Sequence, residues 1–243
     1  MTNSTTATPR ACELPLLEAL GLVKVYDTRG VKTRALDGVD FAVGEGEFTA
    51  LAGPSGSGKT TLLNMLGGLD VPDEGTVRLD GQDYGALSSS ALSQLRLEHL
   101  GFVFQAYNLI PVLSARENVE FVMELQGVAV ATRRARAEEV LAQVGLAGLG
   151  EKRPLEMSGG QQQRVAVARS IASRPRVVLA DEPTANLDSQ TARSLLDLMK
   201  QLNREHGVTF LFSTHDPLVM EAARRLVRMQ DGKVVSDEPK GGA

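Results

Sequence analysis

The chain has 243 residues, of which 42% are hydrophobic and 23% are charged, a balance typical of a folded globular protein with a sizeable core. Its formal net charge of −4 gives no general attraction to nucleic acid or to anionic lipid, which argues against a DNA- or RNA-binding protein. The single cysteine, Cys12, excludes an internal disulfide.

Residues 1–14 are polar and lack the apolar run of a signal peptide, so they are predicted to form a flexible tail. From residue 16 to residue 52 the pattern is typical of β-strands, and the last of them, EFTALAG, ends in a Gly-rich loop. The segment TTLLNMLGGL then predicts a buried helix that stops at Gly67 and Gly68. TVRLDGQDY predicts a strand and a turn.

Residues 106–165 are predicted to be mostly helical, because SARENVEFVMELQ and ATRRARAEEVLAQVGL are amphipathic. An α/β core resumes with RVVLADEP, a nearly continuous apolar run typical of a parallel strand that is covered on both faces. A helix ending at Gly207, a buried strand VTFLFSTH and a hairpin around Asp231-Gly232 follow. We therefore predict one domain over residues 15–240, with a core of 15–105 and 166–240 and a helical insertion.

The Gly-rich loop, GPSGSGKT, matches the pattern G-x-x-x-x-G-K-[ST]. Glycines let the backbone turn its N–H groups toward a phosphate, and the next helix points its positive end at the same anion. Lys59 would neutralise phosphate oxygens, and the Thr60 hydroxyl would ligate Mg²⁺. The predicted nucleotide-binding residues of this phosphate loop are Gly53, Pro54, Ser55, Gly56, Ser57, Gly58, Lys59, Thr60 and Thr61.

Two further motifs carry candidate chemistry. Asp181 and Glu182 end an apolar strand, where Asp181 would hold Mg²⁺ beside the phosphate loop and Glu182 would activate the attacking water. MSGGQ, residues 157–161, opens a helix. Ser158 alone would suit an ordinary N-cap, but two glycines in a first turn cost helix stability, which favours a second anion site.

In this order, the three motifs resemble those of the ATP-binding subunits of ABC transporters, over about residues 16–235. MSGGQ is similar to the family's LSGGQ signature, with Met in place of Leu. The resemblance implies an α/β fold: a RecA-like P-loop NTPase core, an N-terminal antiparallel β subdomain and an inserted helical subdomain. It also implies an ATPase that uses ATP and Mg²⁺.

The resemblance assigns four more side chains. Tyr26 resembles the aromatic residue that stacks on adenine, although it would also suit an ordinary strand. Gln105 resembles the glutamine that contacts Mg²⁺ and reports to the membrane subunit, and His215 the histidine at the γ-phosphate. Asp188 resembles an acid that crosses between two subunits, and it also suits a helix N-cap.

In this family two subunits face head to tail, so the resemblance implies a homodimer. Each ATP would lie between one phosphate loop and the signature of the other chain, which here is Ser158, Gly159, Gly160 and Gln161. Water would attack in line, and the catalytic residues would be Lys59, Glu182 and His215.

Between the motifs, stretches such as LGGLD, NLIP and ADEPTANLD are similar to the lipoprotein-releasing and macrolide-export group, the LolD/MacB type. This similarity implies export or extraction through a separate permease at the cytoplasmic face of the cell membrane, with no nucleic-acid partner. We expect the permease to dock near residues 107–119. An ABC importer or a cell-division-type ATPase shares every motif and remains an alternative. A soluble ABC ATPase of DNA repair or translation is disfavoured by the absence of sustained heptads.

Overall fold

The computed structural model describes residues 15–28 and 30–240. The predicted tail and Cys12 lie outside the described residues. The strands are β1 (Leu17–Thr28), β2 (Val31–Val43), β3 (Phe48–Ala52), β4 (Glu74–Leu79), β5 (Gln82–Asp83), β6 (Leu100–Val103), β7 (Val177–Asp181), β8 (Thr209–Thr214), β9 (Arg225–Gln230) and β10 (Lys233–Pro239). The α-helices are α1 (Lys59–Leu66), α2 (Ser89–His99), α3 (Ala115–Leu125), α4 (Val130–Gln143), α5 (Gly159–Ala172), α6 (Ser189–His206) and α7 (Pro217–Ala222).

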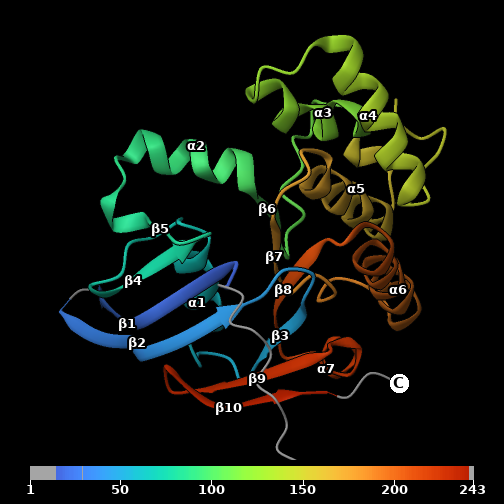
Figure 1. Cartoon of the computed structure of the whole chain (residues 1–243). Coiled ribbons are helices and arrows are strands. Elements are labelled where there is room, and N and C mark those ends of the chain that lie inside the picture. The colour runs from blue at the N-terminus through green and yellow to red at the C-terminus, as the bar shows by residue number, and fades with distance from the viewer. Residues whose placement is uncertain (1–14, 29, 241–243) are drawn as a thin grey trace, which may run out of the picture.

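The strands form two sheets (Figure 1). The larger has the order β10-β9-β3-β8-β7-β6, and all its pairs are parallel except β10 with β9. The smaller has the order β2-β1-β4-β5 and is antiparallel. The antiparallel N-terminal subdomain and the parallel core that the sequence indicated are both present.

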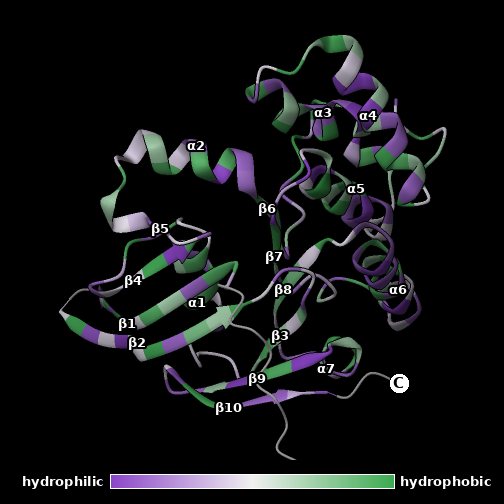
Figure 2. Ribbon diagram, viewed as in Figure 1, coloured by the Kyte–Doolittle hydropathy of each residue, from purple (hydrophilic) through white to green (hydrophobic). Residues whose placement is uncertain are grey.

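Side chains on the two faces of the larger sheet belong to two separate hydrophobic cores. Phe48, Ala50 and Ala52 of β3 belong to the core beneath α3 to α7, whereas Leu51 belongs to the core beneath α1 and the smaller sheet. Because neighbouring side chains of a strand point to opposite faces, the larger sheet is covered on both sides. All five residues of β3 are accordingly buried, and Figure 2 shows hydrophilic residues concentrated instead on helices such as α6.

The predicted helical insertion contains α3, α4 and the start of α5, which pack on one another. Its predicted boundary at 165/166 falls inside α5, which runs unbroken from Gly159 to Ala172. The second half of α5 packs on β6 so closely that a Cβ at Gly101 would lie 2.3 Å from the Ser170 carbonyl oxygen. One helix therefore joins the insertion to the sheet.

Across residues 15–28 and 30–240, no helix is long and apolar enough to cross a membrane.

Candidate active site

The candidate active site is a cleft at the carboxyl edge of the larger sheet. The phosphate loop follows β3, Asp181 ends β7 with Glu182 directly after it, and His215 follows β8. This edge is where open α/β sheets bind their ligands. The cleft has a volume of about 720 Å³, and it is lined by Tyr26, Thr33, Arg34, Ala35, Pro54, Ser55, Gly56, Gly58, Lys59, Thr60, Thr61, Gln105, Glu182 and His215.

Sequence reasoning missed three of these lining residues, namely Thr33, Arg34 and Ala35 of β2. They reach the cleft because β2 pairs with β1 in a register that sets Thr33 opposite Tyr26. No motif marks them, so only the pairing register could have identified them. Of the residues expected to bind nucleotide through the loop backbone, Gly53 and Ser57 do not line the cleft, and the Ser57 side chain is buried.

The phosphate loop requires glycine where its backbone turns. Gly58 has φ of +99°, and a Cβ there would lie 2.5 Å from the Ala35 carbonyl oxygen. A side chain at this position would be both strained and blocked. The Lys59 ammonium is buried beneath the loop and donates to the carbonyl oxygens of Gly53 at 2.8 Å and Pro54 at 2.9 Å. The loop therefore holds its own cation in place.

Two of the three residues expected to hold Mg²⁺, Thr60 and Asp181, are in contact beside the cleft. The Thr60 hydroxyl donates to Asp181 Oδ1 at 3.1 Å and lies 3.4 Å from Oδ2, and the Gln105 side chain lines the adjoining cleft. Hard oxygen donors of this kind fit Mg²⁺, which takes one or two protein ligands and completes its shell with phosphates and water. In the described part of the chain, no group of three or more His, Cys, Asp or Glu residues is placed to hold a metal ion.

Glu182 and His215 form a contact at the end of the cleft. Glu182 Oε1 lies 2.7 Å from His215 Nδ1, and Oε2 accepts from the Thr214 hydroxyl at 3.3 Å and from the His215 N–H at 3.4 Å. The Glu182 carboxylate is 14% exposed and the imidazole 69%. Glu182 also adopts a left-handed φ of 45°, a conformation that costs on the order of 1–3 kcal/mol and is often retained at functional sites. The carboxylate is thus fixed at the position from which it could orient a water.

The signature residues lie away from this cleft, and none of them lines it. Ser158 and Gln161 form a capping box on α5: the Ser158 hydroxyl accepts from the Gln161 N–H at 3.3 Å, and the side-chain Oε1 of Gln161 accepts from the Ser158 N–H at 3.0 Å. A Cβ at Gly159 would lie 2.9 Å from the Tyr107 hydroxyl, and one at Gly160 would lie 2.5 Å from Thr191 Cγ2. A side chain at either position would have to displace Tyr107 or Thr191, so close packing within the chain is a second reason for these glycines beside the anion site that they favour.

Asp188 is the N-cap of α6, as one of its two interpretations predicted. Its Oδ1 accepts from the N–H groups of Gln190 and Thr191, each at 3.0 Å, and its Oδ2 from the Thr191 hydroxyl at 2.6 Å. These bonds to the charged form, led by that from the Thr191 hydroxyl, lower the pKa of Asp188. The carboxylate stays ionised at neutral pH, so it can both cap the helix and carry charge at the surface.

The family model described as "ABC transporter" matches residues 36–185. The chain is 47% identical over 226 residues to the lipoprotein-releasing system ATP-binding protein LolD of Anaeromyxobacter dehalogenans, covering 93% of this chain and 95% of that protein. It is 44% identical over 234 residues to the macrolide export ATP-binding/permease protein MacB of an Azoarcus species, covering 96% of this chain and 36% of MacB. A dimeric ATP-binding cassette solved in a post-hydrolysis state with ADP and Pi has 40% identity and a TM-score of 0.86, over 93% of this chain and 100% of that one.

Proposed function

The chain belongs to the ABC transporter family of ATP-binding proteins, and from this premise we propose that it powers the export or extraction of a substrate through a separate membrane permease. Family membership confirms the predicted P-loop NTPase fold and the predicted ATPase activity. The permease is inferred from the names of the relatives: the chain matches 95% of a LolD protein of a lipoprotein-releasing system, and it also matches 36% of a MacB protein whose name includes a permease. The observation that carries the proposal is this near full-length match, combined with a cleft that brings the phosphate loop, Glu182 and His215 together.

Hydrolysis in the cleft would depend on positioning and on charge stabilisation. The N–H groups of the phosphate loop and Lys59 would bind the β- and γ-phosphates. Glu182, oriented by His215, would hold the attacking water and accept its proton. Bound Mg²⁺, held by Thr60 and Asp181, would neutralise charge on the phosphate oxygens.

The position of the signature supports a dimer in which each ATP contacts both chains. The first N–H groups of a helix have no intrahelical partner, so the start of α5 can bind an anion. The cleft of the same chain contains no signature residue, and a similar cassette is dimeric. We therefore assign Ser158, Gly159, Gly160 and Gln161 to the ATP of the partner chain, with Asp188 at the subunit contact.

Ser158→Ala separates capping from nucleotide contact. Losing the cap should lower the free energy of unfolding by about 1 kcal/mol, and losing a hydrogen bond to a charged phosphate should lower ATP hydrolysis by about tenfold. Thermal melts and a phosphate-release assay measure the two effects. Ser88→Ala is the matched control, because Ser88 caps α2 by accepting from the Ala91 N–H at 3.2 Å. It should lower stability to a similar degree without changing hydrolysis; equal hydrolysis by both variants would argue against the partner-ATP contact.

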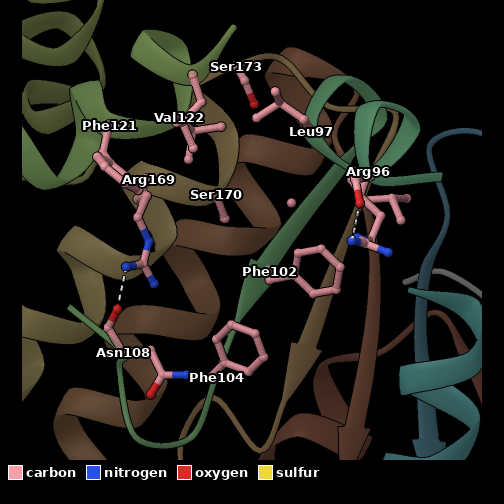
Figure 3. Close-up of a pocket in the computed structure, with 14 residues that line it drawn as sticks. Arg96, Leu97, Phe102, Phe104, Asn108, Phe121, Val122, Arg169, Ser170 and Ser173 are labelled. Atoms are coloured by element: carbon pink, nitrogen blue, oxygen red, sulfur yellow. Dashed lines mark hydrogen bonds between the residues drawn. The ribbon is translucent and has the colours of Figure 1, made fainter. Parts of the chain in front are cut away.

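A groove between the core and the helical region offers a docking surface for the permease (Figure 3). It has a volume of about 440 Å³ and is lined from α2, β6, α3 and α5. Its apolar lining residues are Leu97, Leu100, Phe102, Phe104, Phe121, Val122 and Leu125. Arg96 and Arg169 add positive charge, and Figure 3 shows Arg169 pointing to the Asn108 carbonyl. An amphipathic helix with an acidic residue fits this lining.

The proposed docking groove differs from the site expected from the sequence, because it excludes most of residues 107–119. Arg116 is paired with Glu120, Glu138 and Glu151, and Glu117 completes the capping box of α3. Charge reversals at Arg116 and Glu117, an obvious test from sequence, would therefore disturb the helical region itself. Of the expected segment, only Asn108 lines the groove.

The sharper test places a charge on the groove. The double variant Phe121→Glu and Leu125→Glu should lose co-purification with the membrane permease, because both side chains are exposed, by 37% and 58%, and line the groove. Val130→Glu, on α4 and 60% exposed outside the groove, is the matched control and should retain the permease. Isolated ATP binding should be unchanged in both. Retention of the permease by the double variant would rule out this groove, and ribosomes or DNA in place of a permease would support a soluble ABC ATPase.

A further inference from the structure

The ring of Tyr26 is anchored by a residue far along the chain. Its hydroxyl donates to Asp70 Oδ2 at 2.8 Å, 44 residues away. The other oxygen of Asp70 accepts from Lys24 Nζ at 3.0 Å and from the Val71 N–H at 2.7 Å. Both carboxylate oxygens of Asp70 are thus engaged, and one of them fixes the end of the aromatic side chain.

Lys24 holds the same ring from its face. The Lys24 ammonium lies 5.2 Å from the centroid of the Tyr26 ring and also donates to the Val71 carbonyl oxygen at 2.7 Å, which keeps the cation over the ring. A cation over an aromatic face is an attractive contact. Because Tyr26 also lines the cleft, we infer that its opposite face is the one available to a ligand.

The anchor is continuous with the phosphate loop. Asp70 lies just beyond the end of α1, the helix that begins at Lys59. Asp73 of the same segment accepts from the Val25 N–H at 2.6 Å and donates its own N–H to the Val23 carbonyl at 2.9 Å. Segment 70–73 therefore fixes β1 beside Tyr26 to the helix that carries the phosphate-binding lysine.

We propose that Asp70 is a positioning residue for the nucleotide base, because it holds the Tyr26 ring in the orientation on which adenine stacks. The proposal rests on the assignment of Tyr26 as the adenine platform. A free aromatic side chain would lose rotamer freedom when a base stacks on it, whereas a ring fixed beforehand avoids that cost. Burial, followed by the hydrogen bond to Asp70, raises the pKa of the Tyr26 hydroxyl, so the hydroxyl keeps the proton that it donates.

The test compares a ligand that has a base with one that has none. Binding of ATP and of inorganic tripolyphosphate to the full chain is measured by isothermal titration calorimetry. Tyr26→Phe and Asp70→Ala should each weaken ATP binding by roughly 3- to 10-fold, the cost of ordering one freed side chain on binding, and leave tripolyphosphate binding unchanged. The double variant should bind ATP no more weakly than Asp70→Ala alone, because Asp70→Ala already removes the one contact that Tyr26→Phe removes.

Two controls separate this contact from other effects. Glu74→Gln removes an exposed carboxylate from β4, opposite Val23 in the same sheet, and should leave ATP binding unchanged; weakening there would mean that general charge is responsible and would overturn the proposal. A parallel loss of tripolyphosphate affinity in Asp70→Ala would also overturn it, because the phosphate loop would then be the part disturbed.

Tyr26→Ala tests separately whether Tyr26 is the platform for adenine and whether Asp70 positions it. Removing the ring should weaken ATP binding by roughly 5- to 100-fold through lost stacking. If it does so while Tyr26→Phe and Asp70→Ala bind ATP normally, Tyr26 is the platform but Asp70 does not position it. If Tyr26→Ala itself binds ATP normally, the platform assignment fails.

Discussion

Glu182→Gln is expected to reduce ATP hydrolysis by about 10²- to 10⁴-fold, the usual contribution of a positioned general base, while ATP remains bound. Glutamine keeps the size of the side chain and an oxygen that can face His215, but it cannot accept a proton from water. Two such chains should therefore accumulate as an ATP-bound dimer. Phosphate release measures the first effect, and analytical ultracentrifugation with ATP and Mg²⁺ measures the second.

A second carboxylate serves as the control for this variant. Glu205 is an exposed residue at the end of α6, near the start of β8 and so at the opposite edge of the sheet from the cleft. Glu205→Gln should hydrolyse ATP at the normal rate and show no nucleotide-dependent trapping. Near-normal hydrolysis by Glu182→Gln would instead mean that another group activates the water.

Lys59→Ala should prevent nucleotide binding, in contrast to Glu182→Gln, which should stay bound to ATP. The ammonium is buried, and removing a buried charge that binds an anion costs on the order of 2–5 kcal/mol, so the affinity for ATP should fall by about 10²-fold or more. The variant also removes the ammonium donor from the Gly53 and Pro54 carbonyl oxygens, of which Pro54 still accepts from the Ser57 N–H at 3.2 Å. Calorimetric titration with ATP and with tripolyphosphate checks the prediction, and both affinities should fall.

A loss of affinity for both ligands distinguishes Lys59 from the Tyr26–Asp70 hydrogen bond, whose loss should weaken the binding of ATP alone. Lys200→Ala, on α6, is a control for removal of a lysine and should bind both ligands normally. Retention of ATP affinity by Lys59→Ala would contradict the assignment of the phosphate loop. A thermal melt shows whether the variant is folded, since the loop lies at the start of α1.

Helix prediction succeeded where periodicity was strong and failed where it was weak. The helix ending at Gly207 was predicted, because α6 buries a regular stripe that includes Leu195, Met199 and Leu202 and ends at a left-handed glycine. By contrast, α2 was not predicted, because Leu95 is its only fully buried residue. Its Ser88 cap is the one local signal that could have found it. α7, only six residues long, offered even less.

The sequence by itself determined the chemistry of this protein: the phosphate loop, the acids at 181 and 182, the signature and the family that they indicate. Each of these motifs is local, because neighbouring residues on one strand, loop or helix start carry it, and local geometry follows from local sequence. Only the tertiary structure decided that Asp70 holds Tyr26, that residues 33–35 line the cleft, and that Tyr107 and Thr191 pack closely on the signature glycines. These contacts join segments far apart in the chain, and they depend on strand register and helix packing, which a hydrophobic pattern leaves open.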